Sequence, residues 1–272
     1  MNSAVVNKVI RFSSVDGPGN RTVIFLQGCN FNCRYCHNPE TIGNCVACGN
    51  CIAYCKTGAI SLVDGQMKYD SSKCVNCDEC FHHCPHSSSP KTAVMTSEEV
   101  FREVRRNMPY IRGITISGGE CTLWREFIFE LLSLAKKEGL SMMLDSNGSY
   151  DFSKDSELLS VVDGIMLDIK SCNPEEHQTI TNHTNDLVLR NMEYLAVHDK
   201  LFEVRTVIVP DLFSAVDPVG QTSTLLKRLG KEKKVRYKLI KYRPIGVREA
   251  YRHYKTPSQD TMQMLADVAA EN

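Results

Sequence analysis

Three features are missing from this sequence of 272 residues, and each absence excludes a class of protein. No apolar stretch approaches the roughly 20 residues needed to span a bilayer, so we expect no membrane segment. The first residues, MNSAVVNKVIRF, lack the basic flank and long apolar run of a secretory signal, which favours a cytoplasmic protein. Lysine plus arginine number 32, as do aspartate plus glutamate, so no excess charge favours nucleic acid or an anionic membrane as partner.

Cysteine is absent after Cys172, yet the chain has 13 cysteines, and eleven of them lie between Cys29 and Cys84. Cytosolic thiols stay reduced, so a dense group of cysteines in such a protein usually binds metal rather than forming disulfides. The clustering therefore predicts metal ligation.

Six short runs of β-branched and apolar residues are typical of buried parallel strands. They cover residues 22–28, 113–117, 140–145, 164–170, 202–209 and 235–241. Helical patterns occur over residues 97–108, 124–138, 184–198, 215–229 and 258–270. This alternation predicts a parallel α/β barrel, full or partial, with its chemistry at the carboxyl ends of the strands.

Residues 45–90 differ from the rest, because they are rich in cysteine, asparagine and serine and have few long apolar side chains. We interpret them as an inserted module held together by metal rather than by a hydrophobic core. The main domain is then expected to comprise residues 1–44 and 91–272.

The first cysteine motif, Cys29-Asn-Phe-Asn-Cys33-Arg-Tyr-Cys36, directly follows the first expected strand. A cubane cluster has four irons and normally four thiolates, so three thiolates leave one iron with an open position. That iron could chelate the amino and carboxylate groups of a methionine end, placing a sulfonium beside the cluster. The alternative, zinc or redox thiols, fits poorly because zinc sites favour paired C-x2-C knuckles.

The insert carries two cysteine runs of the bacterial ferredoxin type, in which the fourth cysteine of each run ligates the other cluster. We therefore predict one [4Fe-4S] cluster on Cys45, Cys48, Cys51 and Cys84, and a second on Cys74, Cys77, Cys80 and Cys55. Lys56 stands where proline is usual in such a run. We favour an electron relay as the role of this module, and a purely structural or docking role remains the alternative.

Residues 14–40, SVDGPGNRTVIFLQGCNFNCRYCHNPE, resemble the opening of the glycyl-radical-enzyme activating enzymes, a radical SAM (S-adenosylmethionine) family. The shared elements are Asp16-Gly17-Pro18-Gly19, Arg21, Gln27-Gly28 and the cysteine motif with Tyr35, His37 and Asn38. The similarity covers nearly all the chain outside the insert and is closest to the YjjW-type members. It implies a partial (β/α)6 TIM-like radical SAM barrel with an inserted ferredoxin-like two-cluster module.

The resemblance also implies a SAM pocket. Its expected residues are Tyr35, His37, Gly118, Gly119, Glu120, Ser146, Asn147, Asp168, Lys170 and Arg205, and a monovalent cation (sodium or potassium) is expected at Asp145, Ser146, Met166 and Asp168. Asp168 and Lys170 alternate with apolar neighbours, so both point into the barrel mouth, although a structural ion pair is an alternative. Cys121 stands where the family usually has proline, and Arg243 where it has histidine.

The function implied is reductive cleavage of SAM to methionine and a 5′-deoxyadenosyl radical, which abstracts a glycine Cα hydrogen in a partner glycyl radical enzyme. The adenosyl radical is the reagent, so no catalytic side chain is expected. Three [4Fe-4S] clusters, SAM and an electron donor such as flavodoxin or ferredoxin would be required. The alternatives are a radical SAM enzyme acting on a small molecule or peptide, and a non-enzymatic iron–sulfur electron carrier.

Overall fold

A computed structural model of the chain describes residues 2–229 and 235–271, so the expected main domain lies within it except for residues 1, 230–234 and 272. The strands are β1 Ser3–Ser13, β2 Arg21–Leu26, β3 Ile60–Val63, β4 Gln66–Tyr69, β5 Ala93–Thr96, β6 Gly113–Gly118, β7 Ser141–Ser146, β8 Gly164–Asp168, β9 Leu201–Ile208 and β10 Arg236–Lys241. The α-helices are α1 Glu79–His82, α2 Ser97–Arg105, α3 Arg125–Lys137, α4 Ser156–Val161, α5 Pro174–Thr181, α6 Asp186–Val197, α7 Val216–Leu229 and α8 Gln259–Glu271.

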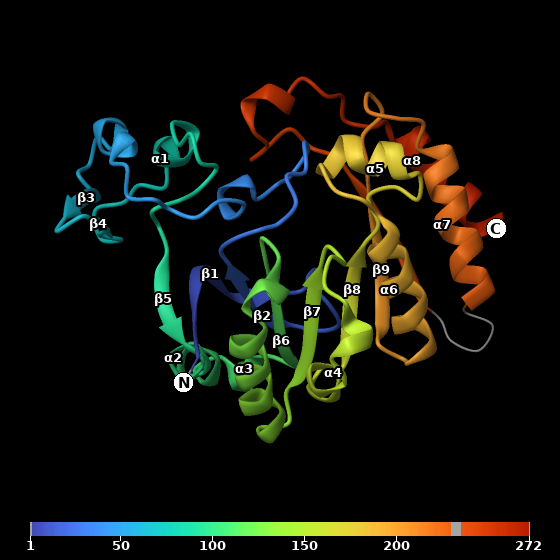
Figure 1. Cartoon of the computed structure of the whole chain (residues 1–272), viewed down its shortest axis with the longest axis horizontal. Helices are drawn as coiled ribbons and strands as arrows, with labels where there is room; N and C mark the ends of the chain where they lie inside the picture. The colour runs from blue at the N-terminus through green and yellow to red at the C-terminus, as the bar shows by residue number, and fades with distance from the viewer. Residues whose placement is uncertain (1, 230–234, 272) are drawn as a thin grey trace.

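An eight-stranded sheet forms the centre of the fold, in the order β10-β9-β8-β7-β6-β2-β1-β5 (Figure 1). Strand β2 and strands β6 to β10 are parallel neighbours and coincide with the six expected runs. The prediction of an α/β fold with a mostly parallel sheet is therefore confirmed. Strand β1, which the sequence did not predict, pairs antiparallel with both β2 and β5. Its sequence SAVVNKVIRFS is interrupted by polar residues, so it lacks a continuous apolar run.

The five expected helices are present as α2, α3, α6, α7 and α8. Helix α2 begins with a capping box in which the side chains of Thr96 and Glu99 each accept from the other's backbone N–H. Helix α3 buries an apolar stripe, including Phe127, Leu131 and Ala135, which packs it against the sheet. None of the described helices is both long and apolar enough to cross a membrane.

The elements within residues 45–90, the expected insert and here called the small unit, lie to one side of the sheet (Figure 1). The unit contains a 3-10 helix over Asn50–Tyr54, a hairpin of β3 and β4, and α1. Its buried apolar cluster consists of Cys51, Ile60 and Cys80 only, with a few half-buried neighbours. So small a cluster contributes little hydrophobic stabilisation compared with the core of the main sheet.

Candidate active site

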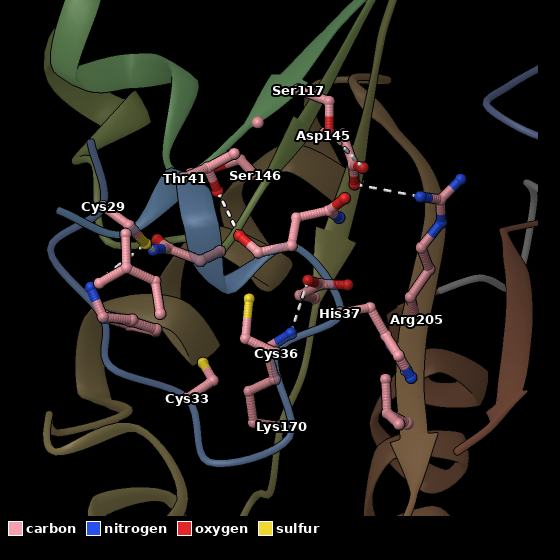
Figure 2. Close-up of a pocket in the computed structure, with 18 of the residues that line it drawn as sticks. Cys29, Cys33, Cys36, His37, Thr41, Ser117, Asp145, Ser146, Lys170 and Arg205 are labelled. Carbon is pink, nitrogen blue, oxygen red and sulfur yellow. Dashed lines mark hydrogen bonds and ion pairs between the residues drawn. The ribbon is translucent and has the colours of Figure 1, made fainter. Parts of the chain in front are cut away.

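A cavity of about 200 Å³ lies at the carboxyl ends of the parallel strands, beside the loop that follows β2 (Figure 2). Cys29, Cys33 and Cys36 line it from that loop. Nine of the ten expected SAM residues line the same cavity: Tyr35, His37, Gly118, Gly119, Ser146, Asn147, Asp168, Lys170 and Arg205. Parallel strands bring these side chains together because each strand ends at the same edge of the sheet.

The loop that carries the three cysteines is anchored to the end of α5. The backbone N–H of Asn32 donates to the carbonyl oxygen of Thr181 at 3.0 Å, and the N–H of Arg34 donates to that of Ile180 at 3.0 Å. The sequence did not predict α5. Its last residues fix the backbone of the loop that carries the three thiols.

The three thiols form no disulfide and are largely withdrawn from water. Burial raises the pKa of each thiol, that of Cys36 to about 12. Among residues 2–229 and 235–271, no three His, Cys, Asp or Glu side chains are arranged to hold a single metal ion. A cubane spreads its ligands more widely, and three soft thiols around one cavity are the donor set that it requires.

The turn after β6 brings two glycines against the neighbouring backbone. Gly118 has a φ of +121°, and a Cβ added to Gly119 would lie 2.1 Å from the carbonyl oxygen of Gly28. Neither position could carry a side chain without moving the backbone. The glycines therefore allow the turn to form one wall of the cavity.

Glu120, the tenth expected SAM residue, does not line the cavity. Its side chain is completely buried and accepts hydrogen bonds from the N–H and hydroxyl of Thr122, the hydroxyl of Ser146 and the N–H of Asn147. Glu120 thus ties the turn after β6 to the turn after β7. The expectation that this carboxylate binds the amino group of SAM stays a prediction, and in the structure the carboxylate faces the two turns.

Asp168 and Lys170 both line the cavity and contact each other. The Nζ of Lys170 lies 2.6 Å from Oδ2 of Asp168, and it also lies 5.9 Å from the centre of the Tyr35 ring. The ion pair that was considered as the structural alternative is therefore present, and it is part of the cavity wall.

Arg205 lies at the centre of a buried network on β7, β8 and β9. Its Nη1 lies 3.1 Å from Asp145, its Nη2 lies 2.7 Å from the sulfur of Met166, and its Nε lies 2.6 Å from Glu203 (Figure 2 shows the contact with Asp145). Burial raises the pKa of Asp145 to about 6, against the opposing effect of Arg205. Sequence reasoning missed Glu203, although its two-residue spacing from Arg205 places both on one face of β9.

The two departures from the family pattern lie away from the cavity wall. The Arg243 side chain is exposed, and the backbone carbonyl of this residue lies 3.0 Å from Nε2 of His37. Cys121 is buried, with its sulfur 3.5 Å from the carbonyl oxygen of Asp145. Neither side chain lines the cavity.

Two further cavities occur in the insert. The first is lined by Cys45, Cys48, Cys51 and Cys84, and the second by Cys55, Cys74, Cys77 and Cys80. Each cavity therefore gathers three cysteines of one run and the last cysteine of the other. This is the crossed grouping that the spacing predicts for two clusters.

Comparison with known proteins gives a consistent picture. Residues 23–212 match the model of the "Radical SAM superfamily". The chain is 30% identical over 253 residues to the pyruvate formate-lyase-activating enzyme of Streptococcus mutans, covering 90% of this chain and 79% of that protein. It is 28% identical over 298 residues to the isethionate sulfite-lyase activating enzyme of Nitratidesulfovibrio vulgaris, covering 99% and 96%.

Solved structures share the fold at low sequence identity. A domain of a pyruvate-formate lyase-activating enzyme from Bacteroides vulgatus matches with a TM-score of 0.50 at 21% identity, covering 58% of this chain and 93% of that chain. QueE from Escherichia coli matches with a TM-score of 0.55 at 12% identity, covering 99% and 90%. At these identities the likeness concerns the fold alone.

Proposed function

Because this chain belongs to the radical SAM superfamily and is a glycyl-radical-enzyme activating enzyme, we propose how its own residues carry out that activation. One electron splits SAM into methionine and a 5′-deoxyadenosyl radical. The radical removes a hydrogen atom from the α-carbon of a glycine in the partner enzyme, leaving 5′-deoxyadenosine and a glycyl radical. No side chain needs to act as acid or base, because the adenosyl radical is the reagent.

We place a [4Fe-4S] cluster on Cys29, Cys33 and Cys36, with SAM in the cavity that these thiols line. When bound, the cluster supplies the electron and an iron with an open coordination position. Lys170 and Arg205 offer positive charge that suits the carboxylate of SAM. The observation that carries this proposal is that one cavity gathers all three thiols and nine of the ten expected SAM residues.

SAM cleavage by the reconstituted protein tests the cluster placement. Under anaerobic conditions with dithionite, the wild type should produce methionine and 5′-deoxyadenosine, and Cys33→Ala should produce neither. Cys172→Ala is the matched control, because this thiol contacts Thr222 at 3.3 Å and does not line the cavity. Full turnover by Cys33→Ala would refute the placement.

The substrate class is tested by electron paramagnetic resonance after a candidate glycyl radical enzyme is added. A glycyl doublet is the expected result. If SAM is cleaved but no doublet appears with any glycyl radical enzyme encoded by a neighbouring gene, a small molecule or peptide is favoured as the substrate.

We further propose that the insert holds two more [4Fe-4S] clusters, one on Cys45, Cys48, Cys51 and Cys84 and the other on Cys74, Cys77, Cys80 and Cys55. The two crossed cavities and the small apolar cluster of the insert support this proposal. The module would receive electrons from flavodoxin or ferredoxin, and a structural role is the alternative.

Iron content distinguishes crossed from uncrossed ligation. Three clusters require about twelve irons per chain, and each lost cluster removes about four. The double variant Cys45→Ala/Cys84→Ala should lose one cluster, whereas Cys45→Ala/Cys55→Ala should lose two. The reverse pattern would refute crossing. If the module is a relay, the Cys45→Ala/Cys84→Ala variant, which should lack one insert cluster, should cleave SAM with dithionite but not with flavodoxin.

We also propose Asp145, Ser146, Met166 and Asp168 as ligands of a sodium or potassium ion. Asp145 contacts Arg205, and Asp168 contacts Lys170, so these protein cations compete with the metal for the same carboxylates. SAM affinity should be higher in potassium or sodium chloride than in tetramethylammonium chloride. Equal affinities would refute the proposal.

A further inference from the structure

The segment after β10, residues 242–255, returns across the top of the sheet toward the insert (Figure 1). At one point it reaches the insert, where Nη2 of Arg252 lies 3.3 Å from Nε2 of His82. At another point it reaches the cysteine loop through Arg248.

The guanidinium of Arg248 binds the backbone of the cysteine loop. Its Nη2 donates to the carbonyl oxygen of Cys33 at 2.8 Å and to that of Asn32 at 3.3 Å. Its Nη1 donates to Oδ1 of Asn32 at 2.6 Å. The guanidinium also packs over the Tyr251 ring, with its central carbon 5.1 Å from the ring centre. This contact within its own segment helps to fix the orientation of the guanidinium.

These contacts add to the backbone hydrogen bonding of the loop around its middle cysteine. The N–H of Asn32 is bound by Thr181 of α5, and its carbonyl is bound by Arg248. The carbonyl of Cys33 accepts from Arg248 and from the N–H of Cys36. Buried backbone groups need such partners, and a loop with both sides bound holds its side chains in one geometry.

We propose that Arg248 is a positioning residue for the cluster: it fixes the loop at Cys33 and places a positive charge beside that ligand. The inference rests on the proposed function, in which Cys33 ligates the SAM cluster. A cation there stabilises the extra negative charge of the reduced cluster, so it makes the reduction potential less negative. Lysine preserves the positive charge, but its ammonium group lacks the planar guanidinium geometry that donates to two backbone carbonyl oxygens and one side-chain amide oxygen together.

The experiment compares Arg248→Gln, Arg248→Lys and a control, Arg106→Gln, in the full chain. Arg106 is exposed at the end of α2, where its Nη1 lies 2.7 Å from Oε1 of Glu103, so its replacement removes the same charge at a remote site. Hydrogen exchange of residues 33–36 in the iron-free protein measures loop order. The potential of the SAM cluster is measured by redox titration, following the part of the paramagnetic signal that changes on SAM addition.

Arg248→Gln should speed exchange by about tenfold or more, because bonds from a charged donor are lost, and should shift the potential to a more negative value. Arg248→Lys should also speed exchange but keep a potential near that of the wild type, and the control should change neither. Wild-type exchange and potential in Arg248→Gln would overturn the inference. If the wild type fails to cleave SAM, the proposed function fails, whereas hydrogen exchange still decides whether Arg248 anchors the loop.

Discussion

Glu120→Gln separates a structural role of this carboxylate from direct contact with SAM. The wild-type carboxylate is fully buried and accepts five hydrogen bonds, four at Oε1 from Thr122, Ser146 and the Cys121 thiol and one at Oε2 from Asn147. A glutamine at position 120 retains one acceptor oxygen. Its NH2 group takes the place of the other carboxylate oxygen and faces a group that had donated a hydrogen bond to that oxygen. The variant therefore keeps the volume of the side chain but places two donors against each other.

The magnitude follows from these contacts. Losing one bond to a charged acceptor costs roughly 1.5–3 kcal/mol, and leaving a buried donor unpaired costs about 1–3 kcal/mol. Because the two costs overlap, the free energy of unfolding should fall by about 2–4 kcal/mol. At about 2–4 °C per kcal/mol for a chain of this size, Tm should fall by roughly 4–16 °C.

Anaerobic thermal unfolding of the reconstituted protein, followed by circular dichroism, measures this change. Glu126→Gln is the control, because its side chain is 67% exposed and its replacement should shift stability by no more than about 0.5 kcal/mol. Direct contact with SAM predicts the opposite pattern, in which Tm is retained and SAM affinity is lost. A Tm within about 2 °C of the wild type would refute the structural role.

Three further outcomes are expected. Gly119→Ala should lose SAM turnover and lower Tm, because its Cβ would lie 2.1 Å from a backbone oxygen, whereas Gly139→Ala meets nothing within 4 Å and should remain active, although its φ of +73° strains an alanine and lowers Tm. Glu203→Gln should weaken SAM binding several-fold and also lower Tm, since the buried Arg205 loses the charge that holds its Nε; unchanged affinity would argue against this positioning role. Burial lowers the pKa of His177 to about 4, so the unfolded chain takes up the proton first, and stability should fall as the pH drops from 6.5 toward 4. Urea unfolding at several pH values should show this slope, and His177→Phe should reduce it.

Much of the fold was predictable because each of the six parallel strands carries a short run rich in β-branched and apolar residues, and helical patterns separate these runs. Strand β1 was missed because polar residues interrupt its pattern. Helix α5 carries a start signal, with Asn173 capping it and Pro174 at its first position, but its eight residues are too few to establish a helical period.

The site was predictable where topology alone sets position, since residues at the ends of adjacent parallel strands must meet. Topology does not set the direction of a side chain within a turn, which is why Glu120 was expected in the cavity wall. Glu203 left a signal in its alternation with Arg205. Arg248 left none, because its partners at Asn32 and Cys33 lie in another part of the chain and no local pattern connects them.

That separation also determines when the cysteine loop can be completed during synthesis. The carbonyl of Cys33 finds its donor 215 positions further along the chain. At about 5–20 residues per second, the ribosome needs roughly 10–40 s to make that intervening length. During this period the cysteine loop of the nascent polypeptide gains its contacts to α5 but lacks those to Arg248, so we expect productive delivery of iron to follow synthesis of Arg248.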